Sequence, residues 1–206
     1  MRALLLIGGG GHCRSCIDVV EAGRQYEVAG IVDNEVPTGT LQLGHAILGT
    51  DDDLPELVER FGAALVTVGQ IKSASVRIRL FGRLRELGAE LPSIISPLAY
   101  VSRHSRIMAG SIVMHGALVN AQASIGENCI LNSQALIEHD VQIGSHCHVS
   151  TGAKINGGVH IGTGNFVGSG AVVREGVRIG DQCVIGAGAI VTRDVPDGTL
   201  VRGRHE

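Results

Sequence analysis

Aliphatic residues recur at every sixth position from Val101 to Val191. The residues at these positions are Val101, Ile107, Val113, Val119, Ile125, Leu131, Ile137, Ile143, Val149, Ile155, Ile161, Val167, Val173, Ile179, Ile185 and Val191. The position two before each of them is nearly always Ala, Ser or Cys. A period of six fits neither an α-helix nor a free strand. It predicts a parallel β-helix, a triangular prism in which each short strand forms one side and each turn forms one corner.

Three sides of six residues close one coil of eighteen residues, and the coils stack roughly 4.8 Å apart. The interior is narrow, so each strand sends in one branched aliphatic and one small residue, in line with an aromatic content of only 2%. Glycines follow the aliphatic position at intervals of eighteen, at Gly126, Gly144, Gly162 and Gly180. We expect this corner to need a residue that tolerates unusual dihedral angles.

The hydrophobic pattern in front of the repeat predicts alternating strands and helices. The expected strands span 3–7, 28–32, 64–68 and 91–95, and the expected helices span 13–22, 54–61 and 73–87. On the last helix, Val76, Leu80, Leu84 and Leu87 form one stripe, with arginines on the opposite face. This alternation predicts a small parallel α/β domain at residues 1–96. The β-helix domain, which includes a C-terminal tail, is expected at residues 97–206.

Composition and charge exclude several classes of protein. The formal net charge is −3 and there is no basic run, which argues against a nucleic-acid surface. No segment reads as a signal peptide or reaches the length of a membrane span, so we expect a cytoplasmic protein.

Three of the five cysteines, Cys129, Cys147 and Cys183, fall at the small inward position and read as core fillers. Cys13 and Cys16 have the spacing of a redox pair, or lie buried at the start of a helix.

A glycine run between the first strand and the first helix, residues 8–11, presents backbone N–H groups and a helix N-terminus to an anion. The match to the dinucleotide fingerprint is partial, because Cys13 stands where the third glycine is expected. Asp33, at the end of the second strand, is placed to accept a hydrogen bond from a ribose or a base. These residues predict nucleotide binding; the alternative is a tight turn followed by a capping acid.

The stretch from Asn132 to Asp140 carries the candidate chemistry of the repeat. Because Ile137 points inward, His139 falls at the following corner, exposed on the prism surface, with Asp140 beside it to hold one ring nitrogen. The pair predicts a general base. Gly157 lies one coil above His139, where a bare backbone N–H can stabilise an oxyanion. Alternatively, Gly157 is only a corner that needs glycine.

Histidines at 139, 146, 148 and 160 raise the possibility of a metal site. One class of carbonic anhydrase also uses this prism, with three histidines that bind zinc across a subunit boundary. The spacing in this chain does not match that arrangement, so we expect no metal.

Taken together, these motifs resemble the bacterial sugar O-/N-acyltransferases of the NeuD/PglD type. The resemblance covers nearly the whole chain. It depends on Gly11-His12, on Asp33, on the hexad run and on the segments 137–140 and 148–153. It implies a Rossmann-like domain followed by a left-handed β-helix, assembled as a homotrimer, and an acetyl-CoA-dependent reaction in glycan biosynthesis.

The resemblance also implies roles for individual residues. His139 would be the base, and Asp140 would raise its basicity. His148, Ser169 and Ala187, together with Gly157, would lie against acetyl-CoA. The nucleotide-sugar would be held by Gly10, Gly11, His12, Asp33, Asn34 and Gly69. The chain departs from the family at Asn34, where a second acid is usual, and at its end, 201–206, where Gly-x-Pro-Ala is usual.

The predicted activity is N-acetylation of the amino group of a 4-amino-dideoxysugar linked to UDP, GDP or dTDP, with direct attack on the thioester. O-acetylation of a sugar, as in sialic-acid modification, is the alternative within the same class. A non-catalytic β-helix scaffold and a zinc enzyme like carbonic anhydrase are the alternatives of other classes.

Overall fold

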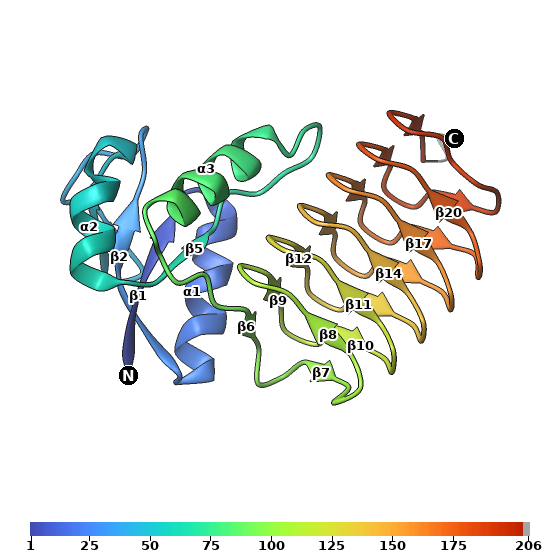
Figure 1. Ribbon diagram of the computed structural model, residues 1–206, viewed down its shortest axis with the longest axis horizontal. Coiled ribbons are helices and arrows are strands. Elements are labelled where there is room, and N and C mark those ends of the chain that lie inside the picture. The colour runs from blue at the N-terminus through green and yellow to red at the C-terminus, as the bar shows by residue number, and fades with distance from the viewer. Residues whose placement is uncertain (204–206) are drawn as a thin grey trace.

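The computed structural model describes residues 1–203 of the chain. It contains a sheet flanked by helices, followed by a stack of triangular coils that ends far from the sheet (Figure 1). The elements before the stack are β1 (Arg2–Ile7), α1 (Gly11–Gly23), β2 (Tyr26–Val32), β3 (Leu41–Gln42), β4 (His45–Gly49), η1 (Asp51–Asp53), α2 (Leu54–Phe61), β5 (Ala64–Val66) and α3 (Ser75–Glu86).

The N-terminal sheet has the strand order β3-β4-β2-β1-β5, and β1 pairs in parallel with both of its neighbours. Side chains of β1 alternate between the two faces. Leu4 and Leu6 pack with the α1 side, whereas Leu5 and Ile7 pack with α2 and α3. Burial on both faces explains why β1 is apolar almost throughout.

Three details of this region differ from the sequence prediction. The segment 33–49 contains β3 and β4, a short antiparallel pair that the polar loop did not reveal. Ile94 and Ile95 do not extend the N-terminal sheet but pair with the second coil of the prism, ahead of the boundary predicted at residue 97. On α3, Val76 is exposed, whereas Arg77 is buried, so the arginines do not all face the solvent.

The stack is a left-handed parallel β-helix with three faces. The first face consists of β6 (Ile94–Ile95), β9 (Ile112–Val113), β12 (Ile130–Leu131), β15 (His148–Val149), β18 (Phe166–Val167), β21 (Val184–Ile185) and β23 (Leu200–Val201). The second consists of β7 (Tyr100–Val101), β10 (Leu118–Val119), β13 (Leu136–Ile137), β16 (Lys154–Ile155), β19 (Val172–Val173) and β22 (Ile190–Val191). The third consists of β8 (Arg106–Ile107), β11 (Ser124–Ile125), β14 (Gln142–Ile143), β17 (His160–Ile161) and β20 (Arg178–Ile179).

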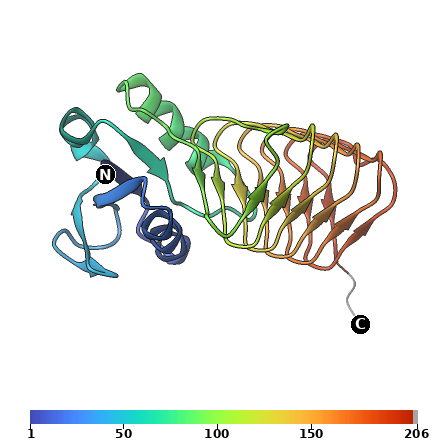
Figure 2. The same ribbon diagram turned by 90° about the horizontal axis from the view of Figure 1, so that it is seen from below.

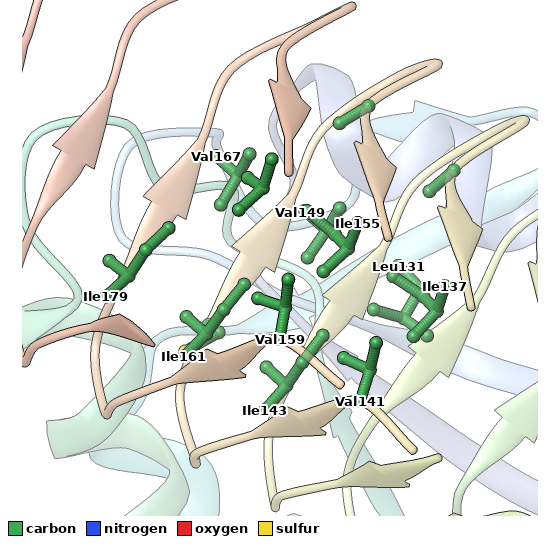
Figure 3. Close-up of a cluster of buried hydrophobic side chains, with 14 of the residues drawn as sticks. Leu131, Ile137, Val141, Ile143, Val149, Ile155, Val159, Ile161, Val167 and Ile179 are labelled. Carbon is green, nitrogen blue, oxygen red and sulfur yellow. The ribbon is translucent and has the colours of Figure 1, made fainter. Parts of the chain in front are cut away.

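The register follows the predicted eighteen-residue coil. Ile125 pairs with Ile143, and Ile143 pairs with Ile161. The side chains of Ile143 and Ile161 point into the prism, where they meet aliphatic residues of the other two faces (Figure 3). The prediction of a β-helix from the hexad repeat is therefore confirmed. We name the corners by chain order: the first corner follows the first face, the second corner follows the second face, and the third corner follows the third face.

Small polar side chains form a column inside the third corner. Its members, eighteen residues apart, are Ser111, Cys129, Cys147, Asn165 and Cys183. The Cys147 thiol donates to the Gly162 carbonyl at 3.0 Å, and the Asn165 amide donates to the Gly180 carbonyl at 2.8 Å. The cysteines thus fill the core, as expected, and also satisfy buried corner carbonyls that would otherwise be unpaired.

The glycines of the third corner do not have the unusual dihedral angles that we expected. Gly126, Gly144, Gly162 and Gly180 are absent from the positive-φ residues of the described chain. Space is the reason for glycine here. A Cβ on Gly144 would lie 2.7 Å from the carbonyl carbon of Gly162 in the next coil. Successive coils approach so closely at this corner that no side chain fits between them.

The N-terminal region packs on the first face of the prism. Ile112, Met114 and Ile130 of that face share a buried cluster with α1. Polar contacts flank this cluster: His115 Nε2 lies 2.8 Å from Asp18, and Arg85 of α3 pairs with Glu127 at 2.7 Å. Figure 2 shows the helices gathered at this end of the stack. The predicted departure at the chain end falls partly on residues 204–206, which lie outside the described residues.

Candidate active site

His139 lies at the second corner, directly after β13. Ile137 is fully buried inside the prism and fixes the corner, so the His139 side chain points outward and is 66% exposed. Its Nδ1 lies 2.8 Å from Oδ2 of Asp140. A carboxylate only accepts hydrogen bonds, so Nδ1 carries the proton and Nε2 is left free to accept one. The pair therefore has the form of an oriented general base.

Glu138 stabilises the same corner through two hydrogen bonds that the sequence analysis did not predict. Its Oε2 accepts a hydrogen bond from the Asn120 amide at 2.8 Å and one from the His139 backbone N–H at 3.3 Å. Asn120 precedes Glu138 by eighteen residues, so the coil period placed them one above the other. That spacing is the signal that could have revealed the contact.

Gly157 lies against the imidazole of His139. A Cβ on Gly157 would stand 2.7 Å from Cε1 and 2.8 Å from Nε2 of that ring. The two coils are joined here by a hydrogen bond from the Gly158 N–H to the His139 carbonyl, 2.9 Å. Within residues 1–203, the Gly157 N–H has no hydrogen-bond partner. The structure thus places Gly157, whose N–H makes no backbone hydrogen bond within the described chain, directly against the imidazole of the candidate base.

The glycine run forms one wall of a cavity of about 500 Å³ at the edge of the N-terminal sheet. All the residues expected to hold a nucleotide-sugar line it: Gly10, Gly11, His12, Asp33, Asn34 and Gly69. Helix α1 begins at this wall without a side-chain cap. Because its first residues, Gly11 and His12, line the cavity, the uncapped N-terminus of the helix suits an anionic ligand.

Asp33 has a structural task in this cavity as well. Its carboxylate accepts the backbone N–H of Gly9 at 2.5 Å and those of Glu35 and Val36 at 2.8 Å. Burial raises the pKa of the Asp33 carboxyl, but the three N–H donors outweigh that effect and hold the pKa below its ordinary value. Asn34 accepts from the Asp51 N–H at 2.8 Å, so its amide N–H remains available.

A second cavity of about 570 Å³ lies between the N-terminal region and the first face. It shares Gly11, His12 and Gly69 with the first cavity, and His148 lines its prism side. His148 Nδ1 donates to the Gln70 carbonyl at 2.9 Å, and its Nε2 lies 3.3 Å from the Asn132 amide nitrogen. These two contacts fix the tautomer, with Nε2 as the acceptor.

The other residues assigned to acetyl-CoA lie along the first corner. Ser133, Thr151, Ser169 and Ala187 stack there at intervals of eighteen, starting at the second cavity. Ser169 and Ala187 are exposed, and the Ser169 hydroxyl lies 3.0 Å from that of Ser150. The column forms a ridge of small side chains that leads from the cavity toward the last coils.

Burial lowers the pKa of His12 to about 3 and that of His148 to about 4, and the charge of Arg77 acts in the same direction. Both rings stay neutral in the folded protein, whereas in the unfolded chain they take up a proton below their ordinary pKa of 6.5. Above pH 6.5 neither state binds these protons, and the free energy of unfolding has its full value. As the pH falls from about 6.5 toward 4, the unfolded chain takes up the protons and the free energy of unfolding decreases.

We expect the free energy of unfolding to fall by about 1.4 kcal/mol per pH unit for each ring in this window. Urea unfolding followed by circular dichroism at pH 7 and pH 5 measures it. The double variant His12→Gln, His148→Gln should reduce the difference between the two pH values, whereas His45→Gln, at a partly exposed ion pair, should not. An unchanged difference in the double variant would contradict the assignment.

Within one chain, the residues that line the nucleotide cavity do not lie near His139 and Asp140. The nucleotide cavity and the N-terminal region lie on the first face, whereas His139 lies at the corner between the second and third faces, on the opposite edge of the prism. A hollow of about 750 Å³ along the third face contains none of the predicted site residues. His139 is thus exposed at the second corner, outside all of these cavities.

The histidines do not converge on one point within the chain. His146 Nδ1 contacts Asn128 at the third corner, His148 faces Gln70 on the first face, and His139 occupies the second corner. Among residues 1–203 there is no group of three or more His, Cys, Asp or Glu side chains arranged to hold a metal ion. No helix in the same range is long and apolar enough to cross a membrane.

Comparisons with known proteins match this architecture. The family model described as the PglD N-terminal domain matches residues 3–84, and that of the bacterial transferase hexapeptide (six repeats) matches residues 122–157 and 158–193. No curated protein sequence matches the chain.

Solved structures resemble the whole chain. A histidine mutant of perosamine N-acetyltransferase from Caulobacter crescentus, in complex with CoA and GDP-perosamine, is 34% identical with a TM-score of 0.91, covering 98% of this chain and 94% of that one. The acetyltransferase domain of PglB from Neisseria gonorrhoeae, in complex with acetyl coenzyme A, is 32% identical with a TM-score of 0.90, covering 98% and 96%. WeeI from Acinetobacter baumannii, at 21% identity and a TM-score of 0.75 over 98% and 97%, shares the fold. By identity over nearly its full length, the chain belongs to the NeuD/PglD-type family of hexapeptide-repeat sugar acyltransferases.

Proposed function

We propose that the protein transfers the acetyl group of acetyl-CoA to the amino group of a 4-amino-dideoxysugar carried on a nucleoside diphosphate. The observation that carries the proposal is the group formed by Asp140, His139 and Gly157, an oriented base with a glycine backbone directly against its ring. The cavity that gathers the six predicted nucleotide-sugar residues supports the substrate class. So do the relatives, which were solved with CoA and GDP-perosamine or with acetyl-CoA.

The active site is shared between chains in this proposal. Because His139 and the nucleotide cavity lie on opposite edges of one prism, a second copy must bring its His139 to the cavity of the first. The outward residues of the second face support a trimer, since Leu118 and Leu136 on one side of the exposed Lys154, and Val172 and Ile190 on the other, make most of this face apolar. If the second faces meet around a threefold axis, the first corner of each chain lies beside the second corner of its neighbour.

The substrates then occupy a continuous groove. The nucleoside lies in the cavity of about 500 Å³, with its diphosphate at the start of α1. The sugar points into the second cavity, toward His148. Acetyl-CoA follows the ridge of Ser169 and Ala187 along the first corner, which brings the thioester to His139 of the neighbouring chain. Both reactants are held in one cleft, and this positioning supplies much of the rate.

The chemistry needs no covalent enzyme intermediate. The amine nitrogen attacks the thioester carbonyl as Nε2 of His139 takes its proton, and Asp140 stabilises the imidazolium that results. The Gly157 N–H donates to the developing oxyanion. Collapse of the tetrahedral adduct breaks the C–S bond, and the CoA sulfur leaves and takes the proton back from His139. The products are an N-acetylated sugar nucleotide and CoA.

The test is a screen of nucleotide-linked 4-aminosugars with acetyl-CoA, following thiol release. We expect turnover with one of the UDP-, GDP- or dTDP-linked amines, and a trimer in light scattering. Faster turnover of a sugar hydroxyl acceptor would favour O-acetylation instead. Absence of acetyl-CoA binding in calorimetry would favour a scaffold, and activity lost with a chelator would favour a zinc enzyme.

A further inference from the structure

Arg77 is a buried cation at the junction of the two halves of the chain. It lies on α3 and is only 1% exposed. Its Nη1 donates to the carbonyls of Val66 at 3.1 Å and Val68 at 2.6 Å, at the end of β5. Its Nη2 donates to Asn128 at the third corner, to the carbonyl at 2.9 Å and to Oδ1 at 2.7 Å.

Every acceptor of this guanidinium is neutral. Within residues 1–203 no carboxylate pairs with Arg77, and its Nε is buried without a hydrogen-bond partner. Burial lowers the pKa of Arg77 to about 10, which still leaves it charged at neutral pH. A buried charge without a countercharge is costly, because its hydration is lost and no ion replaces it. The guanidinium is therefore a buried charge with no carboxylate of the described chain beside it, and the ionisable groups near it are the buried thiols of Cys129 and Cys16.

The charge lies beneath the cavity assigned to the nucleotide. Thr67 and Val68 line that cavity, and the Val68 carbonyl is the nearest acceptor of Arg77. On α3, Val76 and Leu80 line the same cavity. After burial, the charge of Arg77 is the next cause of the lowered pKa of His12, which lines the same cavity.

The other cations of this cavity are weak counterparts for a diphosphate. Arg79 lines it but pairs with Asp51 at 3.1 Å. Arg14 is exposed, with Nη2 3.9 Å from the place of a Cβ on Gly11. Water and salt screen an exposed charge, whereas they screen a buried one much less.

We propose that Arg77 is the buried countercharge for the diphosphate of the nucleotide substrate, balanced only when that substrate occupies the glycine-lined cavity. The inference depends on the proposed function, because it requires a nucleoside diphosphate in this cavity. It explains why a chain retains an arginine where an apolar side chain would cost less. The guanidinium acts through the field across β5 rather than by touching the phosphates, and the N–H groups of α1 make the direct contacts.

The affinity of GDP relative to guanosine, of UDP relative to uridine, and of dTDP relative to thymidine, isolates the diphosphate contribution in calorimetry. Arg77→Met removes the charge, and Asn128→Asp supplies a carboxylate 2.7 Å from Nη2 and neutralises it in place. Each should reduce the diphosphate-to-nucleoside affinity ratio by about tenfold or more. Arg77→Lys keeps the charge and should retain most of the ratio. Arg85→Met, which removes an exposed arginine of the same helix, should leave the ratio unchanged.

Salt gives a measurement on the unaltered protein. If Arg77 supplies the countercharge, the ratio of diphosphate to nucleoside affinity persists at about 0.5 M NaCl. The exposed Arg14 should contribute only at low salt, so Arg14→Met should lower the ratio there and have no effect at about 0.5 M NaCl. A ratio that collapses in salt, or that survives both Arg77→Met and Asn128→Asp, overturns the inference. If the unaltered protein binds none of GDP, UDP and dTDP, the proposed function fails first, so the two failures are distinguishable.

Discussion

Replacing His139 by alanine should lower kcat for acetyl transfer by at least about a hundredfold, while the affinity for acetyl-CoA stays nearly unchanged. The loss follows from the geometry of the second corner, where Nε2 is the free base and Asp140 holds the other nitrogen at 2.8 Å. In the proposed complex acetyl-CoA lies along the ridge of the first corner, and the substitution leaves that ridge unchanged. Steady-state rates from thiol release and calorimetry with CoA measure the two quantities.

Two further variants sharpen this test. His139→Asn keeps a polar side chain of similar shape against Gly157 and should lose activity to the same extent, because an amide is no base. Asp140→Asn leaves the ring in place but removes the carboxylate partner, so we expect a smaller loss of about tenfold. His45→Ala, far away on β4, is the control. Near-normal turnover of His139→Ala would refute the base assignment.

Replacing Gly144 by alanine should destabilise the prism by about 3 kcal/mol. The new Cβ would lie 2.7 Å from both the carbonyl carbon and the carbonyl oxygen of Gly162, and 2.9 Å from the Thr163 nitrogen. All of these are backbone atoms fixed by pairing between coils, so the contact can be relieved only by separating two strands. The melting temperature should fall by roughly 6–12 °C for a chain of this size.

The control is Gly82→Ala on α3, where a Cβ meets no atom within 4 Å. There the same methyl group should stabilise the helix by about 0.5–1 kcal/mol. Thermal unfolding followed by circular dichroism compares the two variants. A Gly144→Ala protein that melts with the unaltered chain would show that the coils have room that the structure does not contain.

The prism could be predicted from the sequence because its rule is local and repeats. Each inward aliphatic residue forms the same contacts as the residue eighteen positions away, so the hexad alone determines the register. The same arithmetic placed Gly157 above His139. It did not reveal why Gly144 is glycine, since a dihedral requirement and a steric requirement leave the same residue in the sequence.

The junction could not be predicted, because its contacts depend on how two separately folded units meet. Arg77 on an amphipathic helix reads as a solvated residue, but in the structure it is enclosed between the carbonyls after β5 and Asn128 of the prism. The sequence likewise places Gln70 in a loop, yet its carbonyl accepts a hydrogen bond from His148 and fixes the tautomer of that ring. Ile94 and Ile95 fit either sheet by composition, and the pairing with β9 decided the matter.

The eighteen-residue period of the prism sets how such an enzyme can change its length. An insertion or deletion within the strands must comprise whole coils, since six residues would move every later strand to another face and any number that is not a multiple of six would also turn inward residues outward. Removing one coil beyond Gly157 would leave His139 and Asp140 in place and shorten the prism, and with it the proposed path of acetyl-CoA, by roughly 4.8 Å. A gain or loss of whole coils therefore changes the length of the prism without disturbing the corner that holds His139 and Asp140.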